Sequence, residues 1–316
     1  MNTTSPTTHL IDPAFLRQFF PKDEAGYDMV SLACYFSFHF PDGYRAGVRR
    51  RAAEVCADYW RLCGDRLRWM ITPVKCVWQE VPAGYTMDRW LSAYPAEDWV
   101  WSMIFHSGRI ASEAATYEIV GVGDSTQTFG YSNLFLFVPV TWFHENPSEH
   151  PIALYLRWAA MLQARHGTAG FGLVPPEDSK KREKTFGIAA AFAGQFPGIE
   201  LADNLGNQNV FWGLLSANWL NMIDTTYVEQ LGGLDSIRGQ LAAEPLGAAV
   251  GMHPFDGGVI LSSGEAPQLC ENNQPNRPPL AYGPVARLFK PLRTVRPWGC
   301  WGCPKDESLA RLERLD

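Results

Sequence analysis

The chain has 316 residues, of which 46% are hydrophobic and 19% are charged. This composition is that of an ordinary globular protein, and the length allows one large domain or two small ones with a sizeable core. The net charge of −6 argues against nucleic-acid binding through phosphate neutralisation, and no apolar stretch reaches the length of a membrane span.

Cysteine usage and the N-terminal residues indicate the compartment. Seven cysteines, an odd number without a regular framework, fit a reducing environment better than a secreted disulfide scaffold. The first residues lack a basic stretch followed by an apolar run, so no signal peptide is expected. These features predict a cytoplasmic protein.

The first regular elements are expected after a loosely ordered N-terminal arm that spans residues 1–28. Met29–Phe40 is apolar enough for a buried strand. Tyr44–Leu67 follows as a long helix, because its apolar residues recur three or four positions apart. The run Arg49–Arg51 is interpreted as part of the solvated face of this helix rather than as a phosphate site.

A set of strands is expected next. Trp69–Thr72 predicts a short strand and Met87–Ala93 a helical turn. Strong strand candidates then follow, separated by Gly, Ser and Asp, which favours an antiparallel meander. These strands are Trp99–His106, Tyr117–Val122 and Asn133–Trp142. Because a proline donates no ladder hydrogen bond, regular pairing of the last strand is expected to end near Val138, or the strand to lie at an edge from there on.

The middle of the chain predicts alternating helices and strands. A helix capped by Ser148 is expected to run to about Arg165, and a strand to span Ala169–Val174. The charged run 177–184 then leads into a helix that ends near Pro197.

The stretch Asn204–Gly264 holds the strongest patterns. Val210–Leu215 predicts a buried strand. A helix is expected to open at Thr225 and Thr226, with Glu229 completing a capping box and apolar residues continuing to Leu241. Two short strands, Ala248–His253 and Val259–Ser262, flank turn-forming residues and predict a hairpin.

The chain is expected to close with a short helix at Ala281–Leu288 and a C-terminal tail at 294–316. Residues 29–293 are interpreted as one α+β domain, in which an antiparallel or mixed central sheet packs against several helices.

Charge is uneven along this domain. Residues 43–75 hold eight basic and three acidic residues, whereas residues 76–149 hold nine acidic and two basic ones. The segments either neutralise each other in space or create an acidic surface.

A search for chemistry identifies no catalytic, cofactor or metal site. Cys300 and Cys303 form a C-x-x-C without a second ligand pair, so an inert tail is preferred over a zinc or redox site. His144 and His150 flank Asn146-Pro147, which breaks the helix that a metal site of H-E-x-x-H type needs. An enzyme with a dispersed site stays open as an alternative.

An ordered series of short motifs carries a family resemblance. It runs Asn218-Trp219-Leu220-Asn221, Leu231-Gly232-Gly233-Leu234, Asp256-Gly257-Gly258-Val259-Ile260, Gly264-Glu265-Ala266-Pro267, Tyr282-Gly283-Pro284-Val285-Ala286 and Lys290-Pro291-Leu292-Arg293. The series resembles the bacterial type VI immunity family over roughly residues 30–293. The resemblance implies a cytoplasmic protein that binds and neutralises a toxin encoded beside it, often a nuclease. It implies no catalytic residues.

The leading hypothesis is therefore an immunity protein that binds a cognate type VI secretion toxin, with no nucleic-acid or membrane partner. The oligomeric state does not follow from the sequence. Acidic residues of the 76–149 segment are predicted to complement a basic toxin, namely Glu97, Asp98, Glu113 and Glu118. The alternatives are a small-molecule or peptide-processing enzyme, and an effector chaperone or adaptor of the secretion system.

Overall fold

A computed structural model describes residues 13–126, 130–201, 213–214, 217–270, 281–293, 310 and 313–316. The strands are β1 (Ser31–Phe40), β2 (Trp69–Ile71), β3 (Trp78–Glu80), β4 (Trp101–His106), β5 (Glu118–Gly123), β6 (Ser132–Pro139), β7 (His166–Val174), β8 (Ile199–Leu201), β9 (Leu220–Asp224), β10 (Val250–Phe255) and β11 (Gly258–Ser263). The helices are α1 (Pro13–Arg17), α2 (Ala46–Cys63), α3 (Met87–Ser92), α5 (Trp142–Glu145), α6 (Pro151–Leu162), α7 (Ser179–Gln195), α8 (Thr225–Gln230), α9 (Leu234–Ala243) and α10 (Tyr282–Phe289). Short 3-10 turns are η2 (Gly64–Arg66), η4 (Gly247–Ala249) and η5 (Lys290–Leu292).

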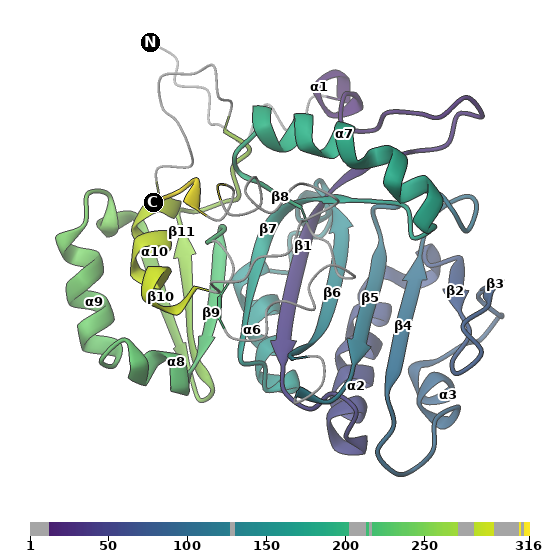
Figure 1. The fold of residues 1–316 in the computed structure, drawn as a ribbon, viewed down its shortest axis with the longest axis horizontal. Helices are drawn as coiled ribbons and strands as arrows, with labels where there is room; N and C mark the ends of the chain where they lie inside the picture. The colour runs from purple at the N-terminus through teal and green to yellow at the C-terminus, as the bar shows by residue number, and fades with distance from the viewer. Residues whose placement is uncertain are drawn as a thin grey trace.

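The described strands form one sheet of 11 strands, which confirms the predicted α+β fold (Figure 1). Its order is β10-β11-β9-β7-β1-β6-β5-β4-β2-β3, with β8 paired to β7. Neighbouring strands are antiparallel except for the parallel pair β7 and β8. The predicted meander is confirmed as β4-β5-β6, and the predicted hairpin as β10-β11 with Phe255 opposite Gly258.

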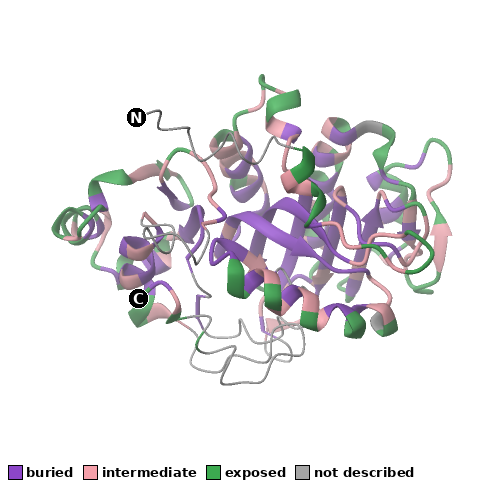
Figure 2. Cartoon of the chain, turned by 90° about the horizontal axis from the view of Figure 1, so that it is seen from above, coloured by how far each residue is buried: buried purple, intermediate pink, exposed green. Residues whose placement is uncertain are grey.

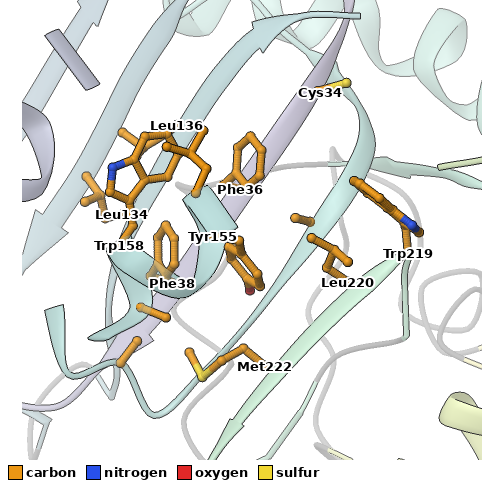
Figure 3. Packing of buried hydrophobic residues seen from close by; sticks show 14 of the residues in the cluster. Cys34, Phe36, Phe38, Leu134, Leu136, Tyr155, Trp158, Trp219, Leu220 and Met222 are labelled. Atoms are coloured by element: carbon orange, nitrogen blue, oxygen red, sulfur yellow. The ribbon is translucent and has the colours of Figure 1, made fainter. Parts of the chain in front are cut away.

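Strand β1 lies at the centre of the sheet, and all of its residues are buried. On one face, Phe36 and Phe38 pack against Tyr155 and Trp158 of α6 (Figure 3). On the other face, Tyr35 joins a smaller apolar cluster with residues of β4, β5 and β6. Burial on both sides explains why β1 reads as a continuous apolar run rather than an alternating one. Figure 2 shows this pattern, with buried strands inside and exposed residues on helices and loops.

Helices α2 and α6 pack together on the first face and are joined by a half-buried acidic group. Asp58 of α2 accepts hydrogen bonds from Trp158 Nε1 at 2.8 Å and from Arg157 Nη2 at 2.8 Å. Helix α6 begins at Pro151 after His150, which provides no side-chain cap, so the expected cap at Ser148 is wrong. Proline at the first helical position explains this start, since it needs no hydrogen-bond acceptor there.

The central stretch departs from the prediction in two ways. A strand, β9, precedes the helix directly, and Asp224 caps α8 by accepting from the Tyr227 N–H. The helix is also not continuous, because Gly232 and Gly233 have φ of 87° and 90° and separate α8 from α9. Such left-handed angles favour glycine and end a helix. The strand expected at Val210–Leu215 falls largely outside the described residues.

Both ends of the described chain pack against the domain. Phe19, beyond α1, is fully buried and packs with its ring tilted against those of Phe192 and Phe196, in and directly after α7. At the other end, Leu315 is buried and Arg314 pairs with Glu200. Among the helices that the structure describes, none combines the length and the apolar composition that crossing a membrane requires.

Candidate functional site: a rigid apolar surface beside the outermost strands

The structure divides the four acidic residues predicted to meet a partner into two kinds. Glu97 and Asp98 are exposed in the loop between α3 and β4. Glu113 and Glu118 are buried, with exposed fractions of 4% and 1%. The carboxylates of Glu113 and Glu118 thus lie inside the folded domain, whereas Glu97 and Asp98 lie where a partner can reach them.

Glu113 has an internal partner. Its carboxylate accepts hydrogen bonds from Arg109 Nε at 2.9 Å and from the Asp28 backbone N–H at 3.1 Å. Burial raises the pKa of the Glu113 carboxyl, but the hydrogen bonds from Arg109 and the backbone outweigh burial and place the pKa below its ordinary value. Glu113 therefore stays charged and holds the segment before β1 onto the β4–β5 connection.

Glu118 lies inside the sheet near an ion pair between Glu177 and Arg182, whose N–O distance is 2.8 Å. Burial raises the pKa of the Glu118 carboxyl well above its ordinary value, and the negative charge of Glu177 raises it further. The protein interior therefore favours the uncharged form of the Glu118 carboxyl. The acidic character of the 76–149 segment is reduced accordingly at the molecular surface.

Apolar side chains gather where Glu97 and Asp98 lie. Val74, Val77, Trp99 and Val100 are 56%, 57%, 44% and 52% exposed. The first two belong to the turn between β2 and β3, and the other two directly precede β4, the neighbour of β2. We call residues 72–77 and 94–100 together the turn–loop surface. It occupies the end of the sheet where β2, β3 and α3 lie (Figure 1).

The turn of this surface is tightly closed and strained. Thr72 accepts a hydrogen bond at its backbone oxygen from Cys76 N–H at 3.0 Å and one at Oγ1 from Val77 N–H at 3.0 Å. Val74 and Cys76 have φ of 66° and 52°. A β-branched residue is rarely found in this left-handed region, where glycine or asparagine is preferred. The turn therefore presents a valine at an energetic cost.

The loop of this surface is held from beneath by Arg49 of α2. Its guanidinium donates to the backbone oxygens of Glu97 and Trp99, each at 3.1 Å, and to that of Pro95. Arg49 is only 2% exposed, so its assignment to a solvated helix face was wrong. Arginine carries several donors in a fixed planar arrangement, which suits it to binding several carbonyl groups at once.

Asp98 also supports the loop. Its Oδ1 accepts from the Ala46 N–H at 2.9 Å, at the first residue of α2. Nearby, the Trp99 N–H donates to the Tyr44 oxygen at 2.8 Å. A carboxylate at a helix start satisfies free N–H groups and complements the helix dipole. Asp98 is therefore partly structural, which leaves Glu97 as the acidic residue of the loop with a freer side chain.

Tyr94 connects the loop to the turn. Its hydroxyl donates to the Ser102 oxygen at 3.1 Å and lies beside the backbone of Val74. The Arg49 guanidinium lies over its ring, 5.5 Å from the centroid. Burial raises the pKa of the Tyr94 hydroxyl to about 12, so the hydroxyl stays protonated and keeps donating. The turn and the loop are thus parts of one fixed surface.

Two polar hollows of about 830 and 700 Å³ lie at the other end of β2 and β4, away from the turn–loop surface, and share Asp65 and Arg68. The first is also lined by Arg61 and Arg66, and the second by Glu80. Arg61 pairs with Asp58 at 2.7 Å, so part of this basic charge is balanced internally.

The described residues contain no group of three or more His, Cys, Asp or Glu placed to hold a metal ion. Cys300 and Cys303 lie outside the described residues.

Sequence reasoning missed most of the turn–loop surface. It placed Trp99 inside a strand, whereas β4 begins at Trp101 and leaves Trp99 and Val100 exposed. It did not assign a partner role to Val74 or Val77. A signal for Arg49 was available, because Arg49 precedes Ala52 and Ala53 by three and four positions and so shares their buried helix face.

Comparison with known proteins gives an independent view of the chain. The model of the TsiV family, described as "Type VI immunity for VRR-NUC", matches residues 51–309. A solved structure, the Pseudomonas aeruginosa T6SS protein PA0821, has the same fold with a TM-score of 0.78 and 18% identity. The match covers 92% of this chain and 84% of that one. None of the curated proteins matches the chain. The family match includes the turn–loop surface and extends beyond Arg293.

Proposed function

Because the chain belongs to the family of type VI immunity proteins for VRR-NUC, and is thus an immunity protein that neutralises a cognate toxin, we propose that its toxin is a VRR-NUC nuclease. We propose further that neutralisation is stoichiometric: the chain binds the nuclease directly and carries out no chemistry of its own. The family match over residues 51–309 is the observation that carries this proposal.

The surface of the molecule supports a binding role. The turn–loop surface presents exposed aromatic and aliphatic side chains on a backbone that buried groups hold in place. Such side chains supply most of the binding energy at protein interfaces, and a rigid backbone lowers the entropy lost on association. A solid, aromatic-rich core accounts for much of the remaining apolar sequence.

The cytoplasm is the proposed place of action. A nuclease delivered by a secretion system must reach nucleic acid to be toxic, so the immunity protein is needed where nucleic acid is found. The odd number of cysteines is compatible with that reducing compartment, and the described cysteines are free.

The test combines cell survival with titration. We expect coexpression of the chain with the VRR-NUC protein encoded beside it to rescue cells from nuclease toxicity. In a purified nuclease assay, activity should fall linearly and reach zero near a fixed molar ratio of the two proteins. Full inhibition by a small substoichiometric amount would instead indicate an enzymatic action, and absence of both rescue and inhibition would refute the proposed partner.

A further inference from the structure

We propose that the turn–loop surface is where the toxin binds, with Trp99 and Val100 as its apolar anchors and with Arg49 and Tyr94 as positioning residues beneath them. This inference rests on the proposed function, because it takes the VRR-NUC nuclease as the partner. It adds the location of the interface on this chain and the chemistry of the partner's face.

The distribution of exposed apolar residues is the first argument. Within the described residues, the large hydrophobic side chains that are strongly exposed are Val74, Val77, Trp99, Val100 and Leu246. All except Leu246 belong to the turn–loop surface, while Leu246 lies between α9 and β10 at the opposite end of the sheet (Figure 1). Single exposed hydrophobic residues are common, whereas several gathered in one place mark an interaction site.

Preorganisation is the second argument. An exposed loop usually loses conformational freedom when it binds, which reduces affinity. Here the guanidinium of Arg49 already binds the Glu97 and Trp99 carbonyls, and the Tyr94 hydroxyl, which lies beside Val74, binds the Ser102 oxygen. Arg49 and Tyr94 are both buried beneath the loop. They hold the anchors in one arrangement before the toxin arrives.

The strained turn is the third argument. Val74 occupies left-handed backbone at φ 66°, where its branched side chain is unfavourable. Local strain of this kind is typical of functional positions, where the residue is retained for what it contacts rather than for stability. A valine at this tip extends the apolar surface formed by Trp99 and Val100.

Charge identifies the kind of partner. Glu97 and Asp98 lie beside Trp99 and are both exposed, against one lysine, Lys75, in the turn. A nuclease binds a polyanion and therefore needs a basic substrate-binding region. The turn–loop surface fits a toxin face that has an apolar pocket for Trp99 bordered by lysine or arginine side chains.

The experiment measures binding of an inactive form of the VRR-NUC toxin to variants of the full chain. Trp99→Ala and Val100→Asp are expected to weaken binding by about 30-fold or more, as truncation of a hot-spot residue does. Leu246→Ala is the matched control, since Leu246 is 49% exposed at the other end, and it should bind as the parent does. Circular dichroism and thermal unfolding check that each variant is folded.

A charge variant provides a second measurement. Glu97→Lys should slow association several-fold at low salt, and most of this effect should disappear at high salt. Glu229 is an exposed residue of α8, and Glu229→Lys should leave the association rate unchanged at both salt concentrations. If Trp99→Ala is poorly folded, Val77→Asp in the exposed turn replaces it. If the parent binds and all of these variants bind equally well, the proposed surface is wrong while the proposed function stands. If the parent itself does not bind, the proposed function is wrong.

Discussion

The guanidinium of Arg49 donates to the backbone oxygen of Trp99 at 3.1 Å, which places a buried cation directly beneath an exposed aromatic residue. The same guanidinium binds the Glu97 oxygen at 3.1 Å. The first helix of the domain therefore determines the shape of a loop about 50 residues later in the chain. This relationship connects the stability of the fold with the presentation of the surface that we propose binds the toxin.

Replacing Arg49 should affect both properties. Arg49→Met leaves partly buried backbone oxygens of the loop without their donor, so we expect the free energy of unfolding to fall by about 3 kcal/mol. Urea unfolding measures this change, and Arg50→Met is the control. Arg50 is exposed on the same helix, and its replacement should change stability by no more than about 0.5 kcal/mol. Equal effects of the two substitutions would contradict the assigned role of Arg49.

Relief of the strained turn should stabilise the protein. Val74→Asn places a residue that tolerates left-handed backbone at φ 66°, so we expect a gain of about 1 kcal/mol. The same substitution should weaken toxin binding, because it removes an apolar side chain from the surface. Val77→Asn, at a position outside the left-handed region, should weaken binding without the gain in stability. Thermal unfolding and binding measurements separate the two effects.

The sequence predicted more of the sheet than of the surface. The long apolar run of β1 and the strands of the β4–β5–β6 meander were identifiable because each has a strong local pattern. The short strands β3, β8 and β9 were missed, since runs of three to five residues carry little periodicity of their own. Strand β9 depends on long-range pairing with β7 and β11, which no local pattern reveals.

The site was harder to predict because burial decides the role of a charged residue. Glu97, Asp98, Glu113 and Glu118 looked equivalent in a segment rich in acidic residues. The fold leaves Glu97 and Asp98 exposed, pairs Glu113 with Arg109 and encloses Glu118 in the sheet. Arg49 likewise differs from Arg50 only by the side of the helix on which it lies.

Glu118 should influence stability rather than binding. Its folded-state pKa is raised, so the folded protein keeps a proton that the unfolded chain loses above its ordinary pKa of about 4.5. The contribution of Glu118 to the free energy of unfolding therefore declines as pH rises through this region, independently of the other titrating groups. Glu118→Gln removes the titratable proton, and we expect it to be more stable than the parent at pH 8. Toxin binding by Glu118→Gln should be the same as that of the parent. If Glu118→Gln is less stable than the parent at pH 8, the raised pKa assigned to Glu118 is contradicted.

Two buried histidines should make the protein sensitive to mild acid. His39 and His166 stack with centroids 4.6 Å apart. Burial lowers the pKa of His39 to about 3 and that of His166 well below its ordinary value. Because the unfolded chain binds protons below about pH 6.5 and the folded protein does not, the free energy of unfolding should fall as pH drops below 6.5. Each histidine is expected to lower the free energy of unfolding by up to about 1.4 kcal/mol for each pH unit below 6.5.

Urea unfolding between pH 7.5 and 5 tests this dependence. His39→Phe should give a shallower decline than the parent, by about the contribution of one histidine. His144→Gln is the control, because His144 is exposed and its replacement should leave the slope unchanged. A decline that is the same in the parent and in His39→Phe would show that His39 does not titrate on unfolding.

Hydrogen–deuterium exchange of the full chain, alone and with the inactive VRR-NUC toxin, tests the central claim most directly. We predict that toxin binding slows exchange within residues 72–77 and 94–100, while exchange around Leu246 is unchanged. Protection confined to other segments, with unchanged exchange in the turn–loop surface of a saturated complex, would contradict the account.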